Sequence, residues 1–171
     1  MKILVVGGGG REHAIIKKLK ENKAVDIIYA LPGNGGIEQD AECVDIGAKD
    51  IEKITEFAAA KDIDFAVVAP DDPLALGAVD ALEAIGIKCF GPNKAAAVIE
   101  SSKVFSKELM KKYRIPTAEY EVFDDMDKAL SYLDTAAIPA VIKADGLALG
   151  KGVVIAETID EAKSAVRSMM E

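Results

Sequence analysis

The first hundred residues alternate between short apolar runs and longer segments whose apolar positions follow a helical period. Short apolar runs bounded by glycine and proline are typical of parallel strands that are buried on both faces. These runs predict strands at residues 2–6, 25–30, near 43–44, 65–69 and 88–90. The segments between them predict helices at residues 11–22, at 50–61 and from about 74 to Ile85, before Gly86. The alternation predicts an α/β fold with a doubly wound, Rossmann-like parallel sheet.

The pattern changes after about Ala97, where helical periodicity runs through residues 99–114 and ends at Pro116. Beyond it we expect a strand at 119–123, a helix at 125–135, strands at 140–144 and 153–156 around a glycine loop, and a last helix opened by a Thr158–Glu161 capping box. The sequence thus predicts an N-terminal domain at residues 1–100, a linker helix at 101–118 and an incomplete subdomain at 119–171. So short a final segment leaves little room for a core of its own.

Four glycines, residues 7–10, separate the first strand from the first helix. In a doubly wound fold, ligands bind where the carboxyl end of a strand meets the following helix. Glycine lets the backbone approach a ligand closely, and the free N–H groups of a helix start bind anions such as phosphate. Arg11 adds a guanidinium suited to the same group. We therefore expect a phosphate-binding turn, with a tight turn that binds no ligand as the alternative.

The identity of that ligand is a separate question. A dinucleotide fingerprint requires a third glycine where this chain has Glu12, and an acidic residue near the end of the second strand, where the chain reads Tyr29 to Pro32. Both departures count against an NAD(P)-binding domain. His13 is the only histidine, so the chain lacks residues that a catalytic triad or a zinc cluster would need. A capping or hydrogen-bonding role and a catalytic role both stay open for His13.

A second candidate site lies in the last third of the chain. Lys143 ends a predicted strand between apolar residues, where an ammonium group needs an anionic partner. The loop from Asp145 to Gly152 holds three glycines and Lys151, a composition suited to folding over phosphates. Lys103 and Lys107 share one helix face at a spacing of four residues, for which a solvated surface is the alternative.

The net charge, the apolar runs and the cysteine spacing argue against several classes of protein. The 21 Lys and Arg residues against 29 Asp and Glu residues give a net charge of −8, which argues against a nucleic-acid binder with a basic stripe. No apolar run approaches the ~20 residues that span a bilayer, and the run before the glycines is too short for a signal-peptide core. Cys43 and Cys89 lack metal-ligand spacing, so we expect buried, reduced thiols in a cytoplasmic protein.

Five motifs in register carry a family resemblance. They are residues 9–14 (GGREHA), 32–36 (PGNGG), 90–97 (FGPNKAAA), 115–120 (IPTAEY) and 143–153 (KADGLALGKGV). Together they resemble the glycinamide ribonucleotide synthetase (phosphoribosylamine–glycine ligase) family of the ATP-grasp superfamily, over essentially all 171 residues. The resemblance implies a pre-ATP-grasp N-terminal domain followed by part of an ATP-grasp lid subdomain.

The resemblance also implies an activity and a set of binding residues. The family uses ATP to join glycine to 5-phosphoribosylamine through a glycyl phosphate, with Mg²⁺ or Mn²⁺, in purine biosynthesis. The residues that it implies for phosphoribosylamine are Gly9, Gly10, Arg11, Glu12, His13, Asn34, Gly35 and Asp71. The residues that it implies for ATP are Lys103, Lys143, Asp145, Gly146, Gly150, Lys151 and Gly152, with no metal ligand in this chain.

The sequence departs from the family pattern in two places. Asp71 and Asp72 stand where the family usually has a glutamate and a following residue, which shortens the reach toward a sugar hydroxyl. Leu149 replaces an alanine, a change that leaves the glycines and Lys151 in place. The family enzyme is more than twice as long, so we expect a fragment that is inactive alone and lacks the main catalytic residues.

Other functions remain open at this point. They are an NAD(P)-binding oxidoreductase domain, a non-catalytic nucleotide-binding or phosphoribosyl-binding module, and an ATP-grasp enzyme acting on a different carboxylate. We expect small-molecule substrates and neither a nucleic acid nor a membrane as partner. An exposed edge strand in the lid subdomain would also allow a homo-oligomer, because unpaired strand edges invite pairing with another chain.

Overall fold

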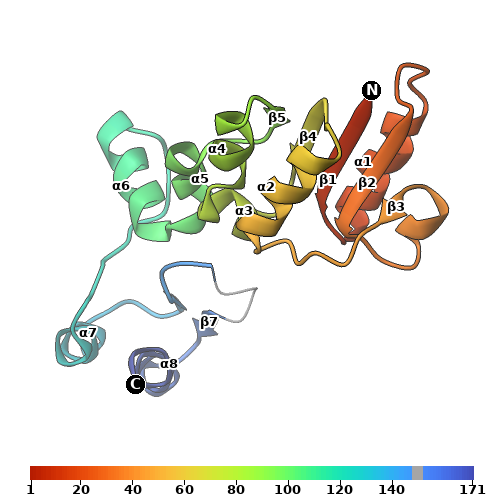
Figure 1. Cartoon of the computed structure of the whole chain (residues 1–171). Helices are drawn as coiled ribbons and strands as arrows, with labels where there is room; N and C mark the ends of the chain where they lie inside the picture. The colour runs from red at the N-terminus through yellow and green to blue at the C-terminus, as the bar shows by residue number, and fades with distance from the viewer. Residues whose placement is uncertain (148–151) are drawn as a thin grey trace. The chain divides into compact units, whose positions relative to one another are not determined.

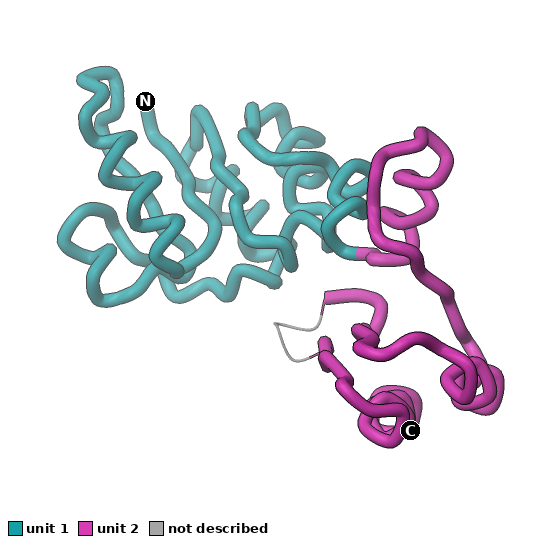
Figure 2. Tube along the Cα trace, turned by 180° about the vertical axis from the view of Figure 1, so that it is seen from behind, with its two compact units in different colours: residues 1–101 teal, residues 102–171 magenta. Residues whose placement is uncertain are grey.

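The computed structural model describes residues 1–147 and 152–171, which form two compact units, residues 1–101 and 102–171 (Figures 1 and 2). The first unit contains a five-stranded sheet in which every neighbouring pair of strands is parallel, in the order β3-β2-β1-β4-β5. The strands are β1 (Lys2–Gly7), β2 (Ile27–Pro32), β3 (Glu42–Cys43), β4 (Phe65–Val68) and β5 (Lys88–Phe90). The predicted parallel α/β sheet is confirmed.

Helices cover both faces of this sheet because successive side chains of β1 point to opposite sides. Ile3 and Val5 pack with Ile16 of α1 (Gly10–Lys20) on one face. Leu4 and Val6 lie in the core of the other face, together with residues of α2 (Ile51–Ala60) and α4 (Ala78–Ala84). The central strand therefore has no solvated face, which explains its unbroken apolar sequence.

Short helices follow the ends of β2, β4 and β5. These are η1 (Ile37–Gln39), α3 (Asp71–Leu76) and α5 (Lys94–Ser101). The sequence predicted one helix up to Ile85, and this prediction was wrong in one respect: α3 and α4 are separate helices. Gly77 divides them because its left-handed backbone, with φ 92°, ends α3 and begins α4.

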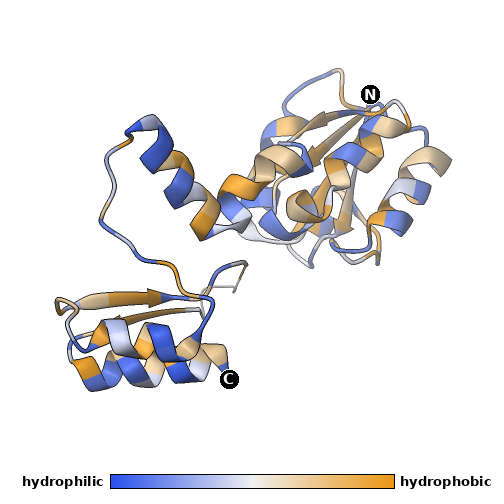
Figure 3. Cartoon of the chain, turned by 90° about the vertical axis from the view of Figure 1, so that its left-hand side faces the viewer, coloured by the Kyte–Doolittle hydropathy of each residue, from blue (hydrophilic) through white to orange (hydrophobic). Residues whose placement is uncertain are grey.

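The second unit begins with α6 (Lys103–Tyr113) and ends in a small two-layer structure. There β6 (Ala140–Lys143) and β7 (Val153–Ala156) form an antiparallel hairpin, and α8 (Ile159–Met170) packs on one of its faces beside α7 (Met126–Leu133) (Figure 3). Its core consists of small and branched side chains: Ala129, Leu133, Ala156, Ala162 and Val166.

Two local predictions for the second unit differ from the structure. Residues 119–123 form no strand, because none of the described residues pairs with them, and an unpaired segment lacks ladder hydrogen bonds. Thr158 does accept the N–H of Glu161, at 3.2 Å, but the Glu161 carboxylate accepts the N–H of Glu157 rather than that of Thr158. The bond from the backbone to the Glu161 side chain therefore comes from the residue before the N-cap, and the capping box differs from the predicted one by one residue.

Both cysteines are free, as expected, but they are half-buried rather than fully buried. Partial burial, with a smaller contribution from the carboxylate of Glu83, raises the pKa of Cys89 to about 11. Its thiol is therefore protonated, and weakly nucleophilic, at neutral pH. Among residues 1–147 and 152–171, no helix is both long and apolar enough to cross a bilayer.

Candidate functional site

Two glycine turns meet at the carboxyl ends of β1 and β2. The N–H of Gly33 donates to the carbonyl of Gly7 at 3.3 Å. The backbones approach so closely that a Cβ atom on Gly8 would lie 2.4 Å from the carbonyl oxygen of Gly33. Gly9 then adopts an extended conformation as the N-cap of α1. The sequence predicted each turn separately, and the structure brings them into direct backbone contact.

Asn34 fastens the second turn to the first. Its side-chain nitrogen donates to the carbonyl of Gly8 at 2.6 Å, and its side-chain oxygen accepts the N–H groups of Gly36, at 2.7 Å, and Ile37, at 3.0 Å. These three bonds use both ends of the Asn34 amide. In this structure Asn34 therefore shapes the site by connecting the turns, a role that its sequence position did not reveal.

Glu12 is the one buried charged residue among those the structure describes, with 4% of its surface exposed. One carboxylate oxygen, Oε2, accepts the N–H of Gly9 at 2.6 Å. The other, Oε1, is buried and has no hydrogen-bond partner among the described residues. The side chain borders the first turn, as Pro70 does, since a Cβ on Gly7 would lie 2.8 Å from both Glu12 Cγ and Pro70 Cγ. An unpaired buried acceptor is unfavourable until a donor reaches it.

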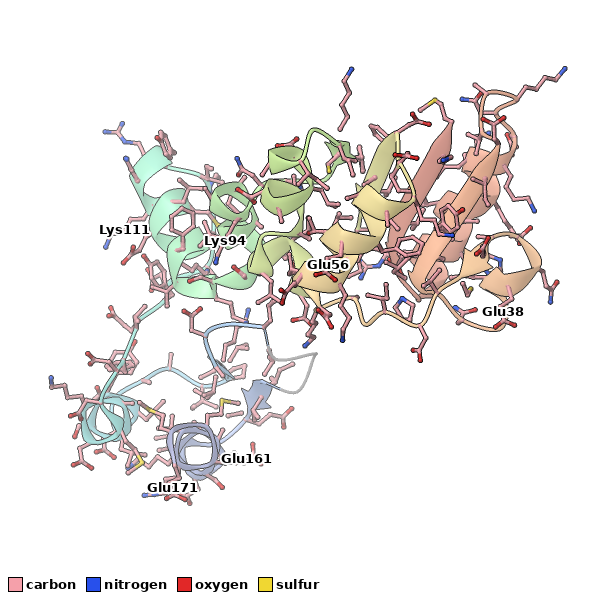
Figure 4. All side chains as sticks on the ribbon, in the orientation of Figure 1. Glu38, Glu56, Lys94, Lys111, Glu161 and Glu171 are labelled. Carbon is pink, nitrogen blue, oxygen red and sulfur yellow. The ribbon has the colours of Figure 1, made fainter. Side chains whose placement is uncertain are left out.

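His13 binds a carboxylate that the sequence analysis did not single out. Its Nε2 lies 2.9 Å from Oδ2 of Asp40, and Oδ1 of Asp40 accepts the ammonium of Lys20 at 2.8 Å. The hydrogen bonds from Lys20 first and from His13 second lower the pKa of Asp40 to about 2. Asp40 directly follows η1, which the labelled Glu38 marks in Figure 4. An isolated aspartate in a loop, 27 residues from its partner, gives no signal in the sequence.

The sign of the Asp40 effect sets its pH dependence. A carboxyl group whose pKa falls on folding stabilises the fold above its ordinary pKa of 3.8. The contribution is therefore complete above about pH 4–5 and is lost as the pH falls through about 2. At neutral pH Asp40 is a charged acceptor.

The remaining predicted sugar-side residues lie at the same edge of the sheet. Arg11, Gly10 and Gly35 are exposed, and Asp71 is the half-buried first residue of α3, the helix that follows β4. Asp72 instead pairs with Lys49 at 2.7 Å. Because parallel strands end at one edge, β1, β2 and β4 bring the two turns and Asp71 to the same end of the sheet.

In the second unit, Asp145 fixes the start of α6. Its carboxylate accepts the backbone N–H groups of Lys103, at 2.7 Å, and Val104, at 3.2 Å, and the hydroxyl of Ser102. Burial alone would raise the pKa of Asp145, but the N–H groups of Val104, Lys103 and Gly146 outweigh it and hold this pKa below its usual value. A carboxylate at a helix N-terminus also interacts favourably with the helix dipole.

Lys103 and the glycine loop are joined by a further bond. The ammonium of Lys103 donates to the carbonyl of Gly146 at 2.6 Å. The structure thus brings together Lys103, Asp145 and Gly146, three of the predicted ATP-side residues. Gly152 is buried and accepts the N–H of Ala144 at 2.9 Å, whereas Gly150 and Lys151 lie outside the described residues.

The side chain of Lys143 is more exposed than the sequence predicted. Lys143 ends β6 opposite Val153 and is exposed, so the prediction that its ammonium group needs an anionic partner because of apolar surroundings was wrong. The cause is the alternation of β6, which turns Ile142 toward the helices and Lys143 toward the open face of the hairpin. No hydrogen bond or ion pair holds its ammonium group within the described part of the chain. Lys107 instead donates to Thr117 and to the carbonyl of Ala118.

Comparison with known proteins identifies the family to which this chain belongs. The description "Phosphoribosylglycinamide synthetase, N domain" matches residues 1–100, and "Phosphoribosylglycinamide synthetase, ATP-grasp (A) domain" matches residues 101–171. The chain belongs to the phosphoribosylglycinamide synthetase family. The resemblance inferred from the five motifs is confirmed, and with it the homology to phosphoribosylamine–glycine ligases.

Individual relatives of this synthetase family agree. The chain is 53% identical to the phosphoribosylamine–glycine ligase of Caldanaerobacter subterraneus subsp. tengcongensis over 100% of its length and 41% of the relative's. It is 47% identical to that of Pasteurella multocida over 99% of its length and 40% of the relative's. The crystal structure of the Thermotoga maritima ligase superposes with a TM-score of 0.75 at 30% identity, covering 96% of this chain and 38% of that one. The chain thus spans about 40% of the length of these curated relatives.

Proposed function

We propose that this chain supplies the sugar-phosphate site and part of the nucleotide-phosphate site of a ligase that joins glycine to 5-phosphoribosylamine. The observation that carries the proposal is the pair of glycine turns in contact at the ends of β1 and β2, within a chain of the synthetase family. Backbone N–H groups at such a helix start favour a phosphate, and close backbone contact leaves the approach free of side chains.

The chemistry of the proposed reaction explains why two phosphate sites are needed. A carboxylate is a poor acceptor for an amine, so ATP first transfers its γ-phosphoryl group to the glycine carboxylate. The amine of phosphoribosylamine then attacks the carbonyl of this glycyl phosphate and loses a proton, and inorganic phosphate leaves with the C–O bonding pair. The products are glycinamide ribonucleotide, ADP and phosphate. The protein contributes by placing the charged groups and by offsetting their charge.

On the sugar side, the predicted residues differ in which hydrogen-bonding groups remain without a partner among the described residues. The N–H of Gly9 is already used by Glu12, so the N–H groups of Gly10 and Arg11, with the Arg11 guanidinium, would hold the phosphate. Oε1 of Glu12 would accept a hydroxyl or amine of the ligand, because it is the buried acceptor without a partner among the described residues. His13, Gly35 and Asp71 would line the same edge, and Asn34 would hold the turns in place.

On the nucleotide side, Lys103 and Lys143 would offset phosphate charge, and Asp145, Gly146 and Gly152 would shape the ends of the hairpin strands. The residues present do not fit a metal centre: within residues 1–147 and 152–171, no group of three His, Cys, Asp or Glu side chains could hold an ion. We therefore assign Mg²⁺ or Mn²⁺ no ligand and no step in this chain.

Replacing Lys143 tests the nucleotide side. We expect Lys143→Ala to weaken ATP binding by roughly tenfold, because it removes a charge-assisted contact to a phosphate. Lys17→Ala is the matched control, since Lys17 is an exposed lysine on α1 in the first unit. Calorimetric titration of both variants with ATP measures the difference. Equal losses in the two variants would contradict Lys143 as a phosphate ligand.

Parallel titrations test the proposed function against its rivals. We expect ribose 5-phosphate and ATP to bind the chain and NAD⁺ not to bind it. NAD⁺ binding tighter than ribose 5-phosphate binding would favour a dinucleotide-binding domain instead. Phosphate release in the presence of ATP, glycine and phosphoribosylamine separates a ligase from a binding module, and we expect these 171 residues to bind without turnover.

A homo-oligomer through the lid hairpin stays a proposal as well. The open face of the hairpin carries exposed apolar side chains at Val141, Val153 and Ile155, and the outer edges of both strands are unpaired within the described residues. Strand edges of this kind pair readily with a second copy. Sedimentation at increasing concentration would reveal such a pair, and a monomer at every concentration would contradict it.

A further inference from the structure

We propose that Asp40 is a positioning residue for His13. It holds Nε2–H of the imidazole, so that Nδ1 faces the turn at residues 34–36 as an acceptor for an N–H or O–H group of the ligand. The ligand class, a phosphorylated sugar with an amine or hydroxyl at its anomeric carbon, rests on the proposed function. The placement of the ring does not rest on it.

The contact joins two elements that are distant in sequence. His13 lies in the first turn of α1, and Asp40 directly follows η1, which itself follows the second glycine turn. Their side chains are 25% and 20% exposed, so the bond at 2.9 Å is partly shielded from water. A shielded, charge-assisted hydrogen bond orients a ring more firmly than an exposed one.

The chemistry of the two side chains determines which ring nitrogen of His13 carries the hydrogen. An ionised carboxylate only accepts hydrogen bonds, so Nε2 must carry the hydrogen whether His13 is neutral or charged. Asp40 stays ionised because Lys20 and His13 bind it and Lys17 adds a favourable charge, which together lower its pKa. In the neutral ring, Nδ1 then carries the lone pair.

The surroundings of Nδ1 leave room for a ligand atom. A Cβ on Gly36 would lie 3.5 Å from Nδ1 and 3.4 Å from Cε1, so the absent side chain of Gly36 leaves this edge of the ring open. No hydrogen bond to Nδ1 exists within the described residues. The Asn34 oxygen, the nearest polar atom to that Cβ, is already bonded to the N–H groups of Gly36 and Ile37. Nδ1 is therefore an available acceptor beside the two turns.

A purely structural role for Asp40 is the competing explanation. In that case the carboxylate would serve to tie α1 to the end of η1 through Lys20, and the His13 contact would be incidental. Lys20→Met separates the two roles, because it removes the ion pair and leaves the His13–Asp40 contact intact. Lys20 is itself exposed, so this variant should fold.

Nitrogen-15 NMR of the imidazole tests the placement directly, since His13 is the only histidine and gives a single pair of ring signals. With the ring neutral, we expect a protonated Nε2, an unprotonated Nδ1 and a visible Nε2–H proton. We expect Asp40→Asn to mix the tautomers and to broaden this proton away, and Lys20→Met to preserve the wild-type signals. Unchanged ring signals in Asp40→Asn, or equal changes in both variants, would overturn the proposal.

Titration with ribose 5-phosphate tests the ligand class. We expect binding to weaken roughly tenfold in Asp40→Asn and less than about twofold in Lys20→Met. Gly36→Ala should also weaken it, while leaving the Nε2–H proton visible, because Gly36 has right-handed helical backbone angles that alanine adopts freely. Wild-type chain that fails to bind the sugar while its ring signals match expectation would contradict the proposed function and the ligand class, and leave the Asp40 placement standing. Full-strength binding by Asp40→Asn would overturn the functional role of Asp40.

Discussion

Gly8→Ala is expected to destabilise the first unit by about 2–4 kcal/mol and to remove detectable binding of ribose 5-phosphate. The added Cβ would lie 2.4 Å from the carbonyl oxygen and 3.1 Å from the carbonyl carbon of Gly33. Both are backbone atoms, so no side-chain rotation relieves the overlap. The two glycine turns must separate, and the hydrogen bond from Gly33 to Gly7 and the bond from Asn34 to Gly8 are lost with them.

Gly10→Ala is the matched control for the stability part of this prediction. A Cβ on Gly10 meets no atom within 4 Å, and Gly10 is the first residue of α1, where alanine is a better helix former. We expect this variant to be neutral or stabilised by up to about 1 kcal/mol. Hydrogen exchange of the buried amides of β1 measures the stability of the first unit. Similar protection in Gly8→Ala and wild type would show that the turns are not in close contact.

Asp145→Ala is expected to accelerate amide exchange at the start of α6 by about 10–100-fold and to weaken ATP binding. The substitution removes the acceptor for the N–H groups of Lys103 and Val104 and for the hydroxyl of Ser102. The carbonyl of Gly146 would then move relative to the Lys103 ammonium group, which donates a hydrogen bond to it. The effect should be present at neutral pH and disappear on acidification through the lowered pKa of Asp145, below which wild type loses the same charge.

Asp124→Ala controls for the loss of one negative charge in the same unit, because Asp124 is exposed. We expect exchange at α6 in this variant to match wild type. Residue-resolved exchange measured by NMR separates the first turn of α6 from its last turn. An effect confined to the last turn, or equal effects of the two variants, would refute the role of Asp145 at this helix start.

The sheet was predictable because its chemistry is local. The apolar runs of β1 and β4 and the turn formers after β2 are visible in short windows of sequence, and buried parallel strands require such runs. The division between α3 and α4 was missed because a glycine in an apolar helical pattern reads as a tolerated interruption. Its positive φ becomes evident only in three dimensions. The segment at 119–123 shows the reverse error, since strand propensity without a pairing partner forms no strand.

The candidate site was predictable as a set of residue types but not as a set of contacts. The glycine turns and Lys143 stand out in the sequence, whereas the hydrogen bonds from His13 to Asp40 and from Asn34 to Gly8 join residues about 26–27 positions apart. The unpaired oxygen of Glu12 likewise depends on the burial of this side chain in the folded first unit. Long-range side-chain contacts of this kind depend on register and packing, which single residues do not encode.

We propose that the turn between β1 and α1, supported by the turn after β2, binds the phosphate of a sugar phosphate. A crystal structure of the chain with ribose 5-phosphate tests it most directly. We expect phosphate oxygens about 3 Å from the N–H groups of Gly10 and Arg11, with a sugar hydroxyl near Oε1 of Glu12. A well-ordered ribose 5-phosphate with its phosphate away from both turns would refute the phosphate-binding role of these turns.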